Sequence, residues 1–256
     1  MDADASSNAW PPSAGELYLP TSINRPAFQG DVFQDVPFVK AKASGNPAKD
    51  PNVNVDRRLV AILGYPCDMY QNGKLVKVQI VAPVTEATKA GVPHNWAGAL
   101  GYSPLPDLLG DGVMYGVDLR GAANIDASYL TRDRRVRSLS RLGWAIFRQR
   151  IVLCATRSMI SLKAFDAIGN SLWHELELWT RWCEVGGDEA SFQAWLDESV
   201  AAFGGFSRRN RMEHGQYELV REDLENDAPS RAQPEPSPLH RQPRAGSTEE
   251  VAPQSG

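Results

Sequence analysis

The segments QGDVF at residues 29–33, RRLVAIL at 57–63 and VKVQIVAPVT at 76–85 decide the fold class of this chain. Each segment is rich in β-branched residues or alternates apolar and polar residues, as strands with one buried face do. A fourth segment of this kind spans residues 113–119. Between two of them, Asn72-Gly73 favours the two-residue turn of a β-hairpin. These patterns predict a partly open, SH3-like β-barrel over residues 27–125, with long connections at 40–56 and 86–111.

The apolar period becomes helical after about residue 128. Val136, Leu139, Leu142 and Ile146 recur at intervals of three and four, which predicts a helix over about 132–157 with an N-cap at Ser128 or Thr131. Further helices are predicted over about 158–185 and 188–203, separated by a Gly-Gly-Asp segment at 186–188. The sequence therefore predicts an α+β protein in which a helical region, residues 128–205, packs on the barrel.

The two ends of the chain have the composition of unfolded segments. Residues 1–25 are rich in Pro, Ser and Ala and predict a flexible lead. Residues 222–256 carry Pro, Ser, Glu and Gln with few large apolar side chains. Such a segment buries too little surface to offset the entropy lost on ordering, so a disordered tail is expected.

Composition excludes several classes of protein. The net charge of −4 argues against a protein that binds nucleic acid over its whole surface. The three cysteines have no paired spacing, which argues against a disulfide scaffold and a zinc site and favours a reducing cytoplasm. No segment is apolar enough to span a membrane, and no secretory signal begins the chain. Phosphate-binding loops and metal-ligand spacings are also lacking, so no cofactor or metal is predicted.

Four arginines repeat at helical spacing in the segment after the barrel, namely Arg134, Arg137, Arg141 and Arg148. On a continuous helix they would share one face and could contact the phosphates of a nucleic acid. The alternative is a solvated face that pairs with acidic neighbours such as Glu175 and Glu177.

Cys67 and Asp68 follow the apolar segment 57–63, at the end of a predicted strand. Cys67 could act as a nucleophile in a Cys-dependent hydrolase if His94 were its base. The alternative is a buried cysteine with Asp68 in a turn, where Asp68 could pair with Arg57 or Arg58.

The order of these segments resembles the MazF/PemK-like toxins, which are small SH3-like barrels with ribosome-independent endoribonuclease activity. The matching features are Gly30-Asp31-Val32 at the first strand, the arginine and apolar strand at 58–63, the PVT step at 83–85, and the segment 135–143 that leads into a helix. The resemblance covers about residues 29–157, with large insertions. It implies that Arg58 and Thr85 line an RNA-cleavage site. Leu59 replaces the proline that follows this arginine in the family.

The resemblance leads to two functional hypotheses. Metal-free RNA cleavage needs a base and a cation that stabilises the developing charge. Arg58 would stabilise that charge, Thr85 would position the phosphate, and Asp31 or Asp68 would be the base. The competing hypothesis is a non-catalytic interaction module, encoded by a phage or mobile element, that binds RNA or an antitoxin-like or host protein. We expect Arg58, Thr85 and Asp68 to share one concave pocket if the first is correct.

Overall fold

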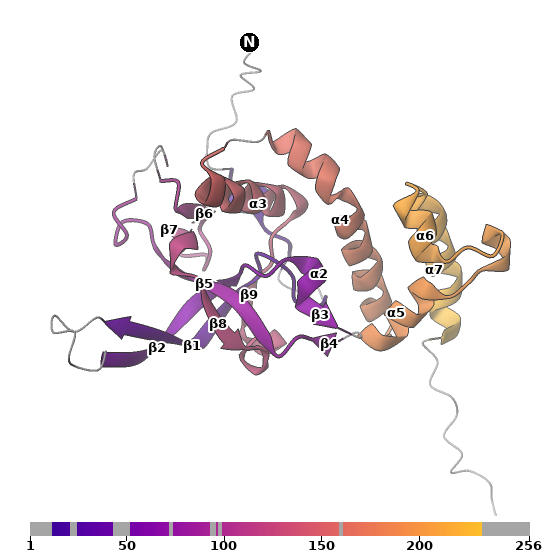
Figure 1. Ribbon diagram of the computed structural model, residues 1–256, viewed down its shortest axis with the longest axis horizontal. Helices are drawn as coiled ribbons and strands as arrows, with labels where there is room; N and C mark the ends of the chain where they lie inside the picture. The colour runs from indigo at the N-terminus through magenta and orange to yellow at the C-terminus, as the bar shows by residue number, and fades with distance from the viewer. Residues whose placement is uncertain are drawn as a thin grey trace, which may run out of the picture.

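The computed structural model describes residues 12–20, 25–42, 52–71, 74–92, 96, 99–158 and 161–231. Within these ranges the chain forms a curled antiparallel sheet followed by a helical C-terminal half (Figure 1). The sheet is open on one side, so it makes a half-barrel. The predicted α+β fold with a partly open sheet is confirmed.

Strand β5 lies at the centre of the half-barrel. It pairs with β2 along one edge, and with β7 and β8 along the other. The sheet order is β6-β7-β5-β2-β1-β9, and all pairs are antiparallel. The strands are β1 Val32–Lys42, β2 Asn52–Ile62, β5 Val78–Glu86, β6 Tyr102–Pro106, β7 Met114–Asp118, β8 Ala123–Asp126 and β9 Arg135–Arg137.

The strands at 29–33, 57–63, 76–85 and 113–119 form where their patterns predict them, within β1, β2, β5 and β7. A short hairpin, β3 Tyr70–Gln71 with β4 Lys74–Leu75, also forms, and its turn at 72–73 lies outside the described residues. The two predicted connections are partly wrong. Strand β1 continues to residue 42 and β2 begins at residue 52, so both enter the connection predicted at 40–56. Strand β6 lies inside the connection predicted at 86–111. Backbone pairing between successive strands, β1 with β2 and β6 with β7, produces these segments despite weak local patterns.

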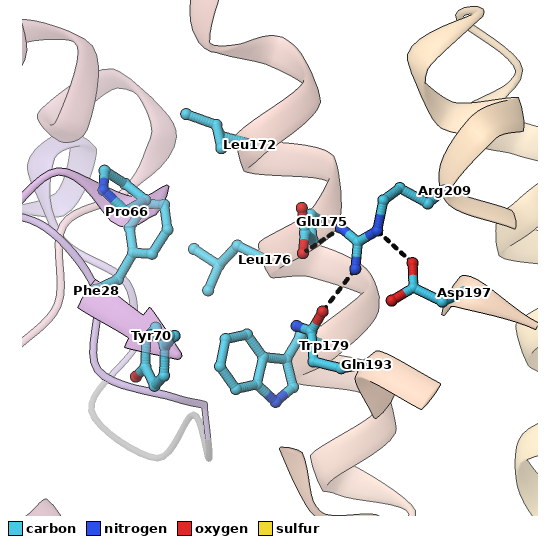
Figure 2. Close-up of a pocket in the computed structure, with 10 residues that line it drawn as sticks. All are labelled: Phe28, Pro66, Tyr70, Leu172, Glu175, Leu176, Trp179, Gln193, Asp197 and Arg209. Carbon is cyan, nitrogen blue, oxygen red and sulfur yellow. Dashed lines mark hydrogen bonds and ion pairs between the residues drawn. The ribbon is translucent and has the colours of Figure 1, made fainter. Parts of the chain in front are cut away.

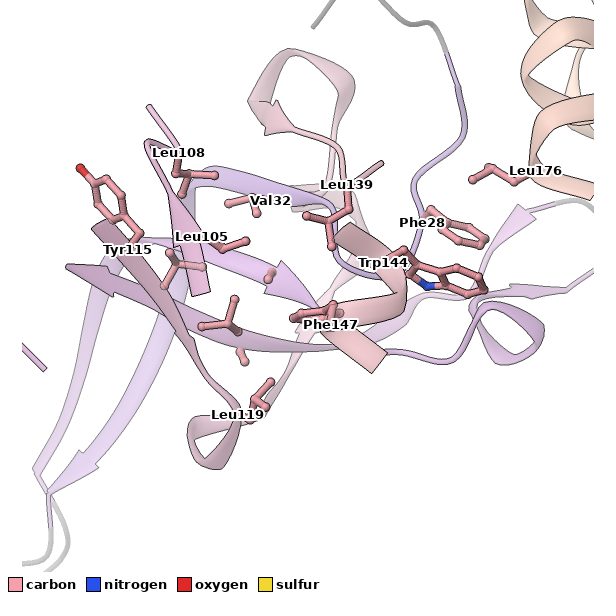
Figure 3. Close-up of a cluster of buried hydrophobic side chains, with 14 of the residues drawn as sticks. Phe28, Val32, Leu105, Leu108, Tyr115, Leu119, Leu139, Trp144, Phe147 and Leu176 are labelled. Atoms are coloured by element: carbon pink, nitrogen blue, oxygen red, sulfur yellow. The ribbon is translucent and has the colours of Figure 1, made fainter. Parts of the chain in front are cut away.

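Each face of the sheet carries its own apolar core. The face toward helix α3, Arg141–Thr156, buries Val32 and Leu105 against Phe147 and Trp144 of that helix (Figure 3). The opposite face buries a second cluster, which includes Phe33, Val60, Met69 and Ile125. Because both faces are covered at the end of β2, residues 59–62 of this strand form a continuous apolar run.

Helix α3 begins later than its apolar period predicts. Residues 135–137 form the edge strand β9 on β1, and Ser140 caps the helix by accepting a hydrogen bond from Gly143 N at 3.1 Å. Leu139 is buried as predicted, but Leu142 is 40% exposed. Gly143 lacks a Cβ that would collide with the Leu17 carbonyl, so the N-terminal segment packs closely on this helix.

The C-terminal half contains α4 Leu162–Glu184, α5 Glu189–Asp197, α6 Arg208–Glu213 and α7 Tyr217–Arg231. Asp188 caps α5 as predicted, since its carboxylate accepts a hydrogen bond from Ser191 N at 2.8 Å. The predicted third helix ends at residue 197 rather than 203, and the helical region continues well beyond residue 205. Apolar side chains from all these helices form a third core; its buried members include Leu178, Trp182, Phe192, Trp195, Val220 and Leu224.

Both ends of the chain are more structured than their composition predicts. Helix α1, Ala14–Leu17, buries Leu17 against α3, and Arg25 is also buried. Helix α7 includes residues 222–231 and buries Leu224 completely, so a disordered tail from residue 222 is wrong for this part. Residues 1–11, 21–24 and 232–256 lie outside the described residues.

Candidate functional site

Asp31 lies in a buried ion-pair cluster at the start of the half-barrel. Its carboxylate is fully buried and accepts hydrogen bonds from Arg25, from Arg135 Nη1 at 3.2 Å and from Phe28 N at 3.0 Å. Burial lowers the pKa of Arg25, while the charge of Asp31 opposes this shift. With two guanidinium partners and no solvent access, Asp31 acts as a structural anion, so its assignment as a candidate base is not supported by its position.

Arg58 and Thr85 line one hollow of about 520 Å³ on the face of the sheet that carries the second core. Leu59 of β2 pairs with Val84 of β5, which places Arg58 and Thr85 on neighbouring strands next to each other. Tyr102 of β6 and Asp118 of β7 complete the polar lining. We call this hollow, with those four polar residues and the flanking Phe38, Pro83 and Lys89, the sheet hollow.

The charged groups of the sheet hollow are held by short-range pairs. Arg58 Nη2 contacts the Asp56 carboxylate at 2.7 Å, and its guanidinium lies 5.9 Å from the Phe38 ring centre. In the described part of the chain, Arg58 Nε is buried without a hydrogen-bond partner. Lys89 contacts Glu86 at 2.6 Å.

Arg120 lies beside the hollow and links two of its lining residues. Its Nε contacts Asp118 at 3.0 Å, its Nη2 donates to the Tyr102 hydroxyl at 2.7 Å, and its guanidinium stacks 4.7 Å from the Tyr102 ring centre. The hydrogen bond with Asp118 raises the pKa of Arg120. The Asp118 carboxylate is therefore already bound to a cation.

Asp68 does not join Arg58 and Thr85. It is exposed on α2, Pro66–Met69, and does not line the sheet hollow. Arg57 pairs with Asp35 and Arg58 with Asp56, so the predicted pairing of Asp68 with either arginine is wrong. The carboxylate that the fold brings to this place is Asp118, at the end of the predicted strand 113–119. In the sequence, the only feature that distinguishes Asp118 is its position at the end of a predicted strand.

The four arginines at helical spacing do not share a face, so that prediction is wrong. Arg134 precedes β9 and donates to the Asp35 carbonyl at 3.2 Å, and Arg137 lies within β9. Arg141 is in the first turn of α3 and donates to Asn170 at 2.7 Å. Arg148 is 8% exposed, between the rings of Tyr65 and Trp144. The segment before Ser140 is extended rather than helical, which disperses the side chains.

The acidic partners suggested for that arginine face have other contacts. Glu175 contacts Arg209 of α6 at 3.3 Å, and Glu177 accepts a hydrogen bond from Trp173 Nε1 at 2.8 Å. The proposed pair of Cys67 and His94 is not tested, because His94 and the side chain of Cys67 lie outside the described residues. The Cys-dependent hydrolase therefore stays a prediction.

A second hollow, of about 420 Å³, lies between the half-barrel and the C-terminal helices (Figure 2). We call it the junction groove. Its floor is one face of α4, and its two walls come from the half-barrel and from α5 and α6. The residues are Leu172, Glu175, Leu176 and Trp179 on the floor, Phe28, Pro66 and Tyr70 on one wall, and Gln193, Asp197 and Arg209 on the other.

Arg209 organises the polar wall of the junction groove. Its Nε contacts Asp197 at 2.6 Å, its Nη1 contacts Glu175 at 3.3 Å, and its Nη2 donates to Gln193 at 2.6 Å. Burial lowers the pKa of Arg209, but these partners outweigh burial and the net shift is upward. Sequence reasoning missed this site, since Trp179 has the signature of a core residue and Arg209 lies in a segment without a motif.

Within the described ranges, no group of three or more His, Cys, Asp or Glu residues is arranged to hold a metal ion, and no helix has the length and apolarity to cross a membrane. A scan against protein-family models finds no matching family, and a search of curated proteins finds no similar chain.

Proposed function

We propose that this protein binds single-stranded RNA in the sheet hollow and that its half-barrel is an SH3-like, MazF/PemK-like domain. One observation carries the proposal. Arg58 and Thr85, the two residues that the resemblance associates with RNA, come from different strands and line the same hollow.

The hollow has the groups that contact a phosphate. A guanidinium matches the geometry of two phosphate oxygens, and a threonine hydroxyl donates a further hydrogen bond. Arg58 now pairs with Asp56, whose side chain is 48% exposed. The Arg58 side chain is 22% exposed, so the pair is partly exposed; surface pairs are worth only about 0–1 kcal/mol, so Arg58 can exchange the carboxylate for a phosphate at modest cost. Its Nε is buried, so the phosphate would contact the Nη groups of Arg58.

The hollow also offers an aromatic ring for a nucleobase. Tyr102 is half-buried at the hollow, and Arg120 covers its ring. Proteins that bind single strands combine cations that follow the backbone with aromatic rings on which bases stack. Since the Arg120 side chain is 59% exposed, a base could replace it on the tyrosine.

The arrangement favours binding over cleavage. A general base must be able to accept a proton from the ribose 2′-hydroxyl. Asp118 is the carboxylate that lines the hollow, and Arg120 already contacts it; Asp56 and Glu86, the partners of Arg58 and Lys89, do not line the hollow. Neither Asp31 nor Asp68 lines it. These contacts therefore support a module that binds RNA rather than one that cleaves it.

The test is the affinity for a fluorescently labelled, uridine-rich single-stranded RNA, measured by anisotropy at several salt concentrations. Arg58→Ala should weaken binding, and the slope of log affinity against log salt should fall by about 0.7 for one lost phosphate contact. The control is Arg221→Ala, because Arg221 also has carboxylate partners but is 44% exposed and lies on α7. The control should bind as the parent protein does.

The same samples separate the competing functions. Cleavage of the RNA in the presence of a chelator, lost in Arg58→Ala, would replace the binding module by the endoribonuclease. Absence of salt-sensitive RNA binding in the parent protein would contradict the proposal and favour a module that binds a protein partner.

A further inference from the structure

We propose that the junction groove is a binding site for a small molecule that has a flat apolar body and one cationic group, such as an amidinium or an ammonium. This site is separate from the sheet hollow, because the two share no lining residue.

The apolar part of the groove suits a flat ring. Tyr70 and Trp179 meet edge to face with ring centres 4.8 Å apart, and Phe28 lies on the same wall as Tyr70. Figure 2 shows these rings and Leu176 facing one another across the groove, with the charged residues on the far side. A volume of about 420 Å³ is within the range of small-molecule sites.

The polar part of the groove determines the charge of the ligand. Two carboxylates, Glu175 and Asp197, stand against one cation, Arg209. All three guanidinium nitrogens of Arg209 already contact protein oxygens. Each carboxylate contacts Arg209 through a single oxygen, Oε1 of Glu175 and Oδ1 of Asp197. The side chains of Glu175 and Asp197 are 28% and 60% exposed, so both carboxylates can accept a further hydrogen bond from a ligand, and the two carboxylates outweigh the one guanidinium in charge. A donor with positive charge is the complement.

The experiment uses the full chain labelled with ¹⁵N and benzamidine as the probe. Its planar amidinium presents two N–H groups to a carboxylate, and its ring fits the aromatic wall. Saturable shifts of the Trp179 indole N–H signal, assigned with Trp179→Phe, report binding. A ligand of this size should bind with a dissociation constant on the order of 1 mM. Benzoate, the matched anion, should not shift this signal.

Two substitutions test the carboxylates without changing the shape of the groove, namely Glu175→Gln and Asp197→Asn. Each should weaken benzamidine binding about threefold to tenfold, because each removes one charge that faces the cation. Glu218→Gln is the control, since Glu218 is also an arginine-paired glutamate but lies on α7. It should leave the affinity unchanged, and so should Arg58→Ala.

Three results would overturn the proposal. One is no shift of the Trp179 signal with benzamidine up to about 10 mM, which corresponds to negligible affinity. Another is equal or tighter binding of benzoate, which would make the groove an anion site built on Arg209. The third is an affinity for benzamidine that neither Glu175→Gln nor Asp197→Asn changes. None of these results bears on RNA binding by the sheet hollow.

Discussion

Arg135 Nη1 lies 3.2 Å from the Asp31 carboxylate and joins the edge strand β9 to the start of β1. Both side chains are almost completely buried, and Arg25 contacts the other oxygen of the same carboxylate. Arg135 also donates to the carbonyls of Pro26 and Arg25, so the cluster fixes the segment that enters the half-barrel. This relationship explains why residues 135–137 form a strand rather than the predicted helix.

Asp31→Ala should destabilise the fold by about 3–5 kcal/mol, because it leaves two buried guanidiniums without their anion. The free energy of unfolding, from urea denaturation, measures this cost. Asp56→Ala removes an exposed carboxylate that also pairs with an arginine and should cost only about 0–1 kcal/mol. Similar costs for the two substitutions would show that the Asp31 cluster is not buried as described.

Leu139 and Leu142 differ in burial, although both belong to the apolar period that predicts a helix over 132–157. Leu139 is 2% exposed and Leu142 is 40% exposed. Leu139→Ala should cost about 2–5 kcal/mol of unfolding free energy, as truncation of buried leucines does. Leu142→Ala should change it by about 0.5 kcal/mol, as surface substitutions do. Equal losses in urea denaturation would instead support a continuous helix over 132–157.

Removal of the last ten residues of α7 should destabilise the helical half. A chain that ends at Arg221 loses the buried Leu224 and also Asp223 and Asp227, which contact Arg208 at 2.5 and 3.6 Å. Of the three carboxylates that contact Arg208, only Glu198 would then remain. Compared with a chain that ends at Arg231, its melting temperature should fall by several degrees, roughly 2–4 °C for each kcal/mol lost. An unchanged melting temperature would contradict the docking of α7.

Substitutions at Tyr102 should distinguish base stacking from hydrogen bonding in RNA binding. Tyr102→Ala removes the ring and should weaken binding by about 1–3 kcal/mol if one base stacks on it. Tyr102→Phe keeps the ring and removes only the hydroxyl that contacts Arg120, so binding should be nearly unchanged. Anisotropy titrations with the uridine-rich RNA measure both. Comparable losses in the two variants would show that the ring contacts no base.

Tyr115 should ionise at unusually high pH. Its hydroxyl donates a hydrogen bond to the Asp111 carboxylate at 2.7 Å, which is the main reason that its pKa rises from 10.0 to about 12. The raised pKa favours the neutral phenol in the folded state. Its contribution to stability is therefore complete below pH 10 and is lost as the pH rises to about 12.

Asp111→Asn provides the test for Tyr115. The pKa of Tyr115 should fall toward its ordinary value, because the amide carries no negative charge. The difference between the phenolate absorbance titrations of parent and variant, from pH 9 to about 12.5, isolates this tyrosine. Identical titrations would contradict the hydrogen bond to Asp111.

The candidate site was only half predictable from the sequence. Arg58 and Thr85 stand on predicted strands, and their partnership follows from the register of Leu59 with Val84. Asp118 replaces Asp68 in the hollow, because the choice of carboxylate depends on which strand ends come together. The junction groove could not be predicted at all, since its walls belong to segments far apart along the chain.

The sequence by itself determined the local structure of the central chain: the strands within 29–33, 57–63, 76–85 and 113–119, the hairpin around 72–73 and the cap at Asp188. Side-chain periodicity, turn preference and capping depend on residues that are close together along the chain, so they can be recognised in the local sequence. Only the tertiary structure decided that 135–137 is a strand, that the four arginines separate and that α7 docks. Those outcomes depend on burial and pairing against distant segments, whose free energies exceed the small local preferences of the chain.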